Sequence, residues 1–231
     1  MKGFQPLRIV RFPIIEKRKA MNQSLSKLKG YRKNQWSRVW GPGSQKGQSL
    51  VEFALTMPLF LLLGLGIIEM GYALYDQHVI VKLTREGSNL ISRGTTLQDA
   101  GTAMNSMTSA PVDFSGSNSK LIFSVLKRVS TTTAGNYNQV ILYQRTQLGS
   151  FSAQSVFTTQ GAGSFGGAPD YIANNSDNDT NLRVTNVPAS LVLNLGQMAY
   201  VTEIYSHHNL ITPFDRIGMS VPTTLYSIAY F

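Results

Sequence analysis

A long apolar run dominates the pattern of hydrophobic and polar positions along the chain. From Phe53 to Ile68, 16 consecutive residues carry no charged side chain. At about 1.5 Å per residue this run spans roughly 24 Å, and with its apolar flanks, about 50–75, it is long enough to cross a hydrocarbon core of about 30 Å. Pro58 lies inside the run, where proline kinks or locally opens a helix. The pattern predicts a single membrane span.

Beyond the span, apolar residues continue at intervals of three and four. The stripe consists of Ile68, Tyr72, Tyr75, Val79, Leu83, Gly87 and Leu90. This spacing is typical of one face of a helix, and Gly94 is a suitable stop. The pattern therefore predicts one helix from about Gln48 to about Arg93, apolar all round in its first half and amphipathic in its second. A shorter helix is predicted over Leu97–Thr108.

The second half of the chain has the texture of strands. Lys120–Ser130 and Asn138–Gln147 are rich in β-branched and aromatic residues and predict a hairpin. Gln197–Ser206 and Val221–Phe231 predict a closing antiparallel pair. Residues 149–190 are rich in Gly, Ser and Asn and predict a long, partly mobile loop. Further short strands are expected at Leu182–Val187 and Leu191–Leu195.

These elements indicate the α+β class. We expect a basic leader arm (1–47), a long transmembrane and amphipathic helix (48–94), and an exported head (95–231) built on a small antiparallel β-sheet packed on the amphipathic half of the helix.

Charge separates the arm from the rest of the chain. Residues 1–47 hold twelve of the 21 Lys and Arg residues and a single acid, Glu16, whereas residues 48–231 hold nine basic and 11 acidic residues. A folded nucleic-acid-binding domain would carry its own basic face, so we expect no nucleic-acid partner. The arm fits a targeting or topogenic segment followed by an exported domain. The alternatives are a basic tail that binds RNA or lipid headgroups, or an amphipathic presequence.

The same charges predict an orientation. Excess Lys and Arg stay on the cytoplasmic side of a membrane, so the N-terminus should be inside and residues after about 75 outside. The chain has no cysteine, which excludes disulfide scaffolds, thiol nucleophiles and iron–sulfur clusters. Only 14% of residues are charged, a polar but uncharged composition that suits an exported surface protein.

The junction between the arm and the helix carries the strongest local signal. Gly47 directly precedes the apolar helix, and Glu52 lies just inside it. A carboxylate at the start of a membrane helix is costly and requires a partner. Cleavage after Gly47 would give Gln48 a free ammonium about one turn from Glu52, in the same or a neighbouring subunit. The alternative is that Glu52 is an ordinary N-terminal helix residue, favoured by the helix dipole.

The residues from Gly47 to Leu74, GQSLVEFALTMPLFLLLGLGIIEMGYAL, resemble the N-terminus of TadE-like proteins, the minor pilins or pseudopilins of the tight-adherence (Flp, type IVb) pilus system. The resemblance places a peptidase cleavage site between Gly47 and Gln48. It assigns Glu52 and the following aromatic, Phe53, to assembly, and Glu69 to the end of the membrane helix.

Weaker similarities lie downstream. Residues 82–88 resemble the family's Arg-Glu-Gly turn, and 201–205 followed by 210–214 is similar to a family ending. Two features depart from the family pattern. The arm is long for a prepilin leader, which leaves Met21 open as the start, and Gln48 can cyclise and so lose its ammonium.

The resemblance implies a membrane-anchored precursor in a bacterial inner membrane, used in pilus assembly and surface adhesion and in some cases incorporated into surface pili. The implied partners are a prepilin peptidase, other pilins packed through the N-terminal helix, the inner-membrane assembly machinery, and membrane lipid. The implied role is not enzymatic, and no cofactor is expected.

Other motifs are weak. Residues 162–166 are a loose variant of a nucleophile elbow around Ser164, but the flanking loop provides neither strand nor helix. Residues 177–181 place oxygen ligands like the start of a calcium loop, but Leu182 and Pro188 occupy positions that need Gly and Glu. His207 and His208 lack further ligands nearby. We therefore expect no catalytic, cofactor-binding or metal-binding residues.

Two other classes of protein stay open. One is a secreted or membrane-anchored, non-catalytic domain behind an ordinary signal peptide or anchor, with cleavage near Gly71-Tyr72-Ala73, where small residues flank a larger one. The unbroken helical stripe through that point argues against it. The other is an exported enzyme, for which no convincing constellation of residues exists.

Overall fold

The computed structural model describes residues 47–213, 216, 218 and 223–231. The predicted leader arm, apart from Gly47, lies outside the described residues, as do the first two residues of the expected last strand. The chain divides into two units, with the boundary between Leu63 and Gly64. Helix α2 (Gln48–Ser92) contributes residues to both.

The predicted long helix is confirmed as α2, which includes Pro58 and is followed by Gly94 in the left-handed region (φ +83°) that favours glycine. In the first unit its apolar side chains are exposed: Leu55 is 74% and Phe60 is 71% accessible. Within the described residues, no side chain in the most apolar stretch of the helix is buried. Its length and composition suit a single-pass membrane anchor.

The predicted short helix is confirmed as α3 (Leu97–Met107). Its start is capped by Thr96, whose hydroxyl oxygen accepts the backbone N–H of Asp99 at 3.1 Å. Leu97, Ala100 and Met104 are buried. They lie three and four residues apart, so α3 turns a single apolar face towards the core.

Four strands form one antiparallel sheet: β1 (Ser119–Arg128), β2 (Val140–Leu148), β3 (Met198–His207) and β4 (Thr224–Tyr230). The order is β2-β1-β3-β4, so the hairpin and the closing pair predicted from the sequence are both confirmed. The central strands β1 and β3 pair over nine residues, and most of their side chains are buried. The α+β class is thereby confirmed.

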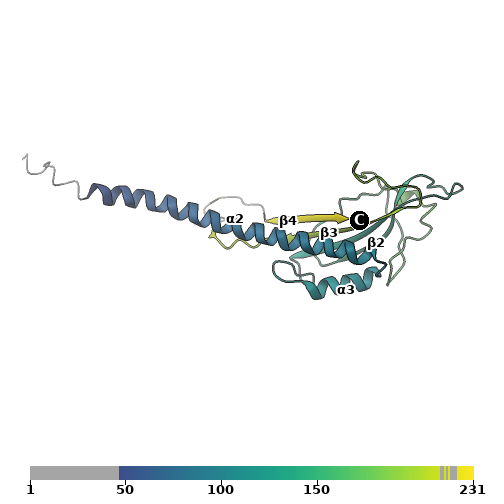
Figure 1. Ribbon diagram of the computed structural model, residues 1–231, viewed down its shortest axis with the longest axis horizontal. Helices are drawn as coiled ribbons and strands as arrows, with labels where there is room; N and C mark the ends of the chain where they lie inside the picture. The colour runs from purple at the N-terminus through teal and green to yellow at the C-terminus, as the bar shows by residue number, and fades with distance from the viewer. Residues whose placement is uncertain (1–46, 214–215, 217, 219–222) are drawn as a thin grey trace, which may run out of the picture. The chain divides into compact units, whose positions relative to one another are not determined.

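One face of the sheet packs against the second half of α2 and against α3 (Figure 1). Its core is the cluster of Ile80, Leu83, Ile91, Leu97, Ala100, Met104, Val112, Phe114, Leu121, Phe123, Val125 and Ile204. Gly87 allows the close approach of helix to sheet, because a Cβ there would lie 2.8 Å from Cγ2 of Thr202. The amphipathic half of the helix therefore packs on the sheet, as its stripe predicts.

The opposite face is covered by the long connection between β2 and β3. Phe157 and Leu193 from this connection pack on Leu142 and Val201. The connection also runs along the outer edge of β2, where the N–H groups of Ala173 and Val184 donate to strand carbonyls at 2.8 and 2.9 Å. Its predicted mobility stays a prediction.

The two short strands expected in this connection were wrong. Thr180–Leu182 is a 3-10 helix, η2, and only isolated bridges at Arg183 and Val184 follow it. Pro188 cannot donate to a ladder. Residues 191–195 form no strand and lead instead into a turn at Gly196 (φ +78°).

Candidate functional site

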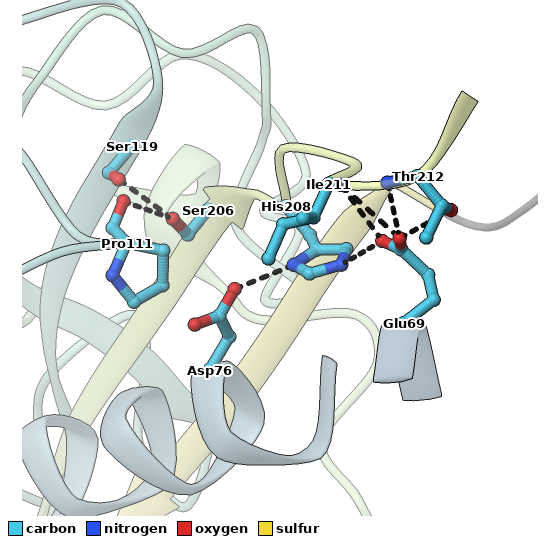
Figure 2. A network of polar contacts seen from close by, with 8 residues as sticks. All are labelled: Glu69, Asp76, Pro111, Ser119, Ser206, His208, Ile211 and Thr212. Atoms are coloured by element: carbon cyan, nitrogen blue, oxygen red, sulfur yellow. Dashed lines mark hydrogen bonds and ion pairs between the residues drawn. The ribbon is translucent and has the colours of Figure 1, made fainter. Parts of the chain in front are cut away.

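A buried acid on α2 receives the loop that follows β3. Glu69 is 4% exposed, and its Oε2 accepts the backbone N–H of Thr212 at 2.9 Å and the Thr212 hydroxyl at 2.6 Å. The N–H of Ile211 donates to the same oxygen at 3.2 Å. Figure 2 shows these donors converging on the carboxylate. Residues 211 and 212 are therefore held on the helix through a single side chain, and we call this contact the Glu69 latch.

His208 extends the latch along the helix. Its Nε2 lies 3.1 Å from Oε1 of Glu69 and its Nδ1 lies 2.6 Å from Oδ2 of Asp76, with the ring 1% exposed (Figure 2). Glu69 and Asp76 are seven residues apart, two turns of helix, so both carboxylates lie on the same face. A neutral imidazole has one N–H, so both contacts are hydrogen bonds when the ring carries both protons. In that state one buried cation is paired with two carboxylates, which offsets the cost of burying it.

The end of β3 is also tied to the start of β1. The hydroxyl groups of Ser206 and Ser119 lie 2.9 Å apart, and Ser206 donates to the carbonyl of Pro111 at 3.3 Å. Ser206 precedes His208 by two residues. Loop 208–212 therefore follows a strand end that is held by hydrogen bonds to Ser119 and Pro111.

A second buried acid lies on the other face of the sheet. Glu203 on β3 is fully buried and accepts the hydroxyl of Ser155 and, at 2.8 Å, the N–H of Val156. Ser155 also accepts a hydrogen bond from Nη2 of Arg145 at 3.0 Å. Burial lowers the pKa of Arg145, and the charge of Glu203 opposes this effect. Glu203 therefore fixes the connection between β2 and β3 over the sheet.

Two tyrosines border Glu203. The Tyr226 hydroxyl donates to Glu203 at 3.4 Å, and its ring lies 4.6 Å from that of Tyr205. Burial, followed by the negative charge of Glu203, raises the pKa of Tyr205 to about 12 and also raises the pKa of Tyr226. Both phenols therefore stay protonated at neutral pH and act as hydrogen-bond donors.

The predicted processing and assembly residues lie together on the first turns of α2. The Gln48 side-chain amide donates to Oε1 of Glu52 at 3.0 Å, and both residues are exposed. The N–H of Val51 donates to the carbonyl of Gly47, and Phe53 is 63% exposed. The described residues provide no other hydrogen bond to the Glu52 carboxylate. It is therefore accessible to another molecule.

The weaker motifs find ordinary structural places. The Ser164 hydroxyl accepts a hydrogen bond from the side-chain amide of Asn174 at 2.9 Å. Asp177 pairs with Lys127 at 2.9 Å. Within the described ranges, no group of three acidic or histidine side chains has the geometry of a metal site.

Most of helix α2 is similar to a known protein family. Residues 47–89 match the family model described as TadE-like protein. This segment is TadE-like. It contains every site residue that the sequence resemblance assigned, from Gly47 to Glu69, and the resemblance over the helix is thereby confirmed. No curated protein and no solved structure matches the chain.

Sequence reasoning found Glu69 but missed its partners. The TadE-like segment ends at residue 89, whereas His208 and Thr212 lie more than a hundred residues further along. The only available signal was the pair His207-His208 directly after a predicted strand. Glu203 lies in the segment 201–205, which is similar to a family ending. Nothing near it in the sequence indicates that Ser155 forms a hydrogen bond with it.

Proposed function

We propose that the chain is a minor pilin or pseudopilin of a Tad/Flp-type pilus, made as a membrane-anchored precursor that a prepilin peptidase cleaves between Gly47 and Gln48. The TadE-like segment associates the chain with the Tad pilus system. The observation that supports the finer role is an exposed apolar helix start whose one carboxylate, Glu52, contacts only Gln48 among the described residues.

The helix start is suited to exchange of partners. An exposed apolar surface of this extent is typical of contact with membrane or with another protein. Lipid tails and leucine side chains are similarly apolar, so moving this helix from lipid to a bundle of helices changes little apolar burial. The energy that selects the assembled state must therefore come from polar groups and packing, and Glu52 is the acid in the helix start. The role is structural, without catalysis.

The proposed orientation puts the leader arm in the cytoplasm and the head outside, in a bacterial inner membrane. The basic residues flanking the N-side of the span outnumber those on the C-side, which comprise Lys82, Arg85 and Arg93. The proposed partners are the peptidase, other pilins, the assembly machinery and lipid. We place the end of the span near Glu69, because loop 208–212 contacts α2 through that residue.

The experiment scores cleavage and piliation of variants side by side. A Cβ at Gly47 would meet no atom within 4 Å, so Gly47→Phe should leave the fold unchanged and block cleavage. Gly64→Ala is the matched control, since Gly64 is equally open and lies away from the cleavage point. N-terminal sequencing and intact mass should show Gln48 first, or its pyroglutamate form, in the wild type and in Gly64→Ala.

Glu52→Ala tests assembly. Its exposed contact with Gln48 is worth a few tenths of a kcal/mol, so the helix should be inserted and cleaved as before. We expect no pili in this variant and partial piliation in Glu52→Asp. Thr56→Ala is the control, because within the described residues its hydroxyl donates to carbonyls of its own helix alone. Normal pili in Glu52→Ala would contradict the role of Glu52, and an uncleaved product would move that role to peptidase recognition.

Determining the mature N-terminus would also distinguish the proposal from the alternative of an ordinary signal peptide. Cleavage near Gly71–Ala73 would remove Glu69 and leave the amide of Thr212 without its acceptor. A mature protein beginning at Leu74 would nevertheless overturn the pilin proposal, as would an intact Met1 or Met21 in cells with an active peptidase.

A further inference from the structure

A small cavity lies between α3 and the β2 end of the sheet. It has a volume of about 240 Å³, and its floor includes the buried rings and chains of Leu97 and Phe123. None of the residues that line it carries a charge. The volume is just below the usual range for drug-sized ligands, so the cavity suits one small molecule.

One locally unfavourable residue lines this cavity from the helix. Gly101 occupies the middle of α3, where glycine destabilises a helix relative to almost any other residue. Packing does not require it, because a Cβ at this position would meet no atom within 4 Å. Its absent side chain instead leaves open the space between Gln98 and Asn105. These two residues lie three before and four after it, on the same face of the helix.

A second unfavourable residue lines the same cavity from the opposite wall. Tyr171 has φ +53°, a left-handed conformation that is uncommon for a bulky side chain and costs free energy. Backbone hydrogen bonds hold it there, since its N–H donates to the carbonyl of Gly167 and its own carbonyl accepts the N–H of Arg145. Backbone strain of this kind concentrates at binding sites. Two locally unfavourable positions therefore face one small cavity, and the Tyr171 ring also packs against the core cluster.

The lining indicates the chemistry of the ligand. The side-chain amides of Gln98 and Asn105 each donate and accept, and both residues are exposed, so these groups are accessible to a ligand. The Thr146 hydroxyl adds to this set, and the Tyr171 ring offers an aromatic surface beside them. The Thr102 hydroxyl donates to the carbonyl of Gln98 at 3.0 Å and can still accept a hydrogen bond from a ligand. A charged ligand would find no countercharge here. The cavity therefore matches a neutral molecule with many hydroxyl groups and an apolar C–H face.

We propose that this cavity binds a neutral sugar ring, as a free saccharide or as the end of a surface glycan. The inference goes beyond the pilin role. It is tested on purified protein, so its failure is distinguishable from a failure of cleavage or piliation.

The test uses the full chain in micelles of a detergent without a sugar headgroup. Saturation-transfer NMR is recorded with glucose, galactose, mannose, N-acetylglucosamine and N-acetylgalactosamine as probes, and with glucuronic and N-acetylneuraminic acids as charged counterparts. At least one neutral sugar should receive saturation, and the two acids should receive at least tenfold less. Absence of transfer to every neutral sugar, or stronger transfer to the acids, would overturn the proposal.

The decisive variant is Gly101→Gln, which fills the cavity from the open position. It should reduce saturation transfer at least tenfold while the thermal midpoint stays level or rises, because the substitution removes a helix glycine. Ser106→Gln is the matched control, because it adds the same side chain to an exposed position of α3 outside the cavity. Tyr171→Gly keeps the backbone conformation accessible and removes the ring, so it should also lose binding. Binding that survives Gly101→Gln would place the sugar elsewhere and overturn the assignment.

Discussion

Removal of the Glu69 carboxylate should release loop 208–212 without unfolding the head. Four groups from this loop lie within 3.2 Å of the carboxylate: the N–H of Ile211, the N–H and the hydroxyl of Thr212, and the ring of His208. Glu69→Ala removes their acceptor. Thr212 is 5% exposed, so water cannot replace the lost partner until the loop opens.

The magnitude follows from the kind of hydrogen bond that is lost. A hydrogen bond to a charged group contributes about 1.5–3 kcal/mol, and a factor of ten in an equilibrium corresponds to about 1.4 kcal/mol. The loss of even one such bond therefore shifts the loop towards its open form by roughly 10- to 150-fold. Opening exposes the remaining donors to water, which limits the total loss. The expected result is local opening rather than global unfolding.

Hydrogen exchange measured by mass spectrometry reports this opening directly. Peptides covering Ile211 and Thr212 should exchange roughly 10- to 150-fold faster in Glu69→Ala, and by an intermediate factor in Glu69→Gln, which keeps one acceptor oxygen. Peptides from β1 should exchange at the wild-type rate, because their ladder bonds to β2 and β3 are untouched. Glu86→Ala is the matched control, since it removes an exposed carboxylate from the same helix.

Two outcomes would refute the reasoning. Unchanged exchange at Ile211 and Thr212 in Glu69→Ala would show that the carboxylate does not hold the loop. An equal acceleration in β1 would show that Glu69 supports the whole head, and the latch would then not be a local device.

Two further substitutions test the helix–sheet contact and the buried phenols. Gly87→Ala should lower the free energy of unfolding by about 1–3 kcal/mol in thermal or denaturant melts, because its Cβ would lie 2.8 Å from Thr202 Cγ2 and 3.2 Å from Phe123 Cε1; an unchanged midpoint would contradict this close approach. The Tyr205 hydroxyl has a pKa of about 12 in the fold, whereas an unfolded tyrosine ionises near about pH 10. The unfolded state therefore loses its proton first, so stability should fall as pH rises from about 10 to about 12; a Tyr205→Phe chain whose denaturant midpoint falls just as steeply would exclude this cause.

The sequence predicts those parts of the fold that depend on local pattern. The apolar run, the stripe ending at Leu90 and the stop at Gly94 are sufficient for α2, since each lies within a few residues of its neighbours. The strands follow from β-branched runs in the same way. The two short strands expected on either side of Pro188 do not form, although the side-chain composition there resembles that of strands. The first segment is held instead by backbone hydrogen bonds to β2, and the second leads into a turn at Gly196.

The buried sites could not be predicted, because their partners are distant in the sequence. The contact of Glu69 with His208 joins residues 139 positions apart, and that of Ser155 with Glu203 joins residues 48 apart. The strained Tyr171 likewise gives no signal in its neighbouring residues. By contrast, Gln48 and Glu52 are one turn apart on a single helix, so the sequence was sufficient to bring them together.

Glu52 and Glu69, the two acids of the apolar helix segment, differ in whether their carboxylates are accessible to another molecule. Every near donor to Glu69 comes from the head of the same chain, and its carboxylate is buried. Glu52 is exposed and contacts a neighbouring amide alone among the described residues. A charge already satisfied within its own subunit cannot also select a neighbour, whereas one that is unsatisfied in lipid gains from pairing. Intermolecular register should therefore depend on Glu52, and the attachment of the head to its anchor on Glu69. The distinction is testable in a single pair of strains. Glu52→Ala should abolish pili and leave exchange at Thr212 unchanged, and a Glu52→Ala chain with an opened loop would show that the two acids act as one unit.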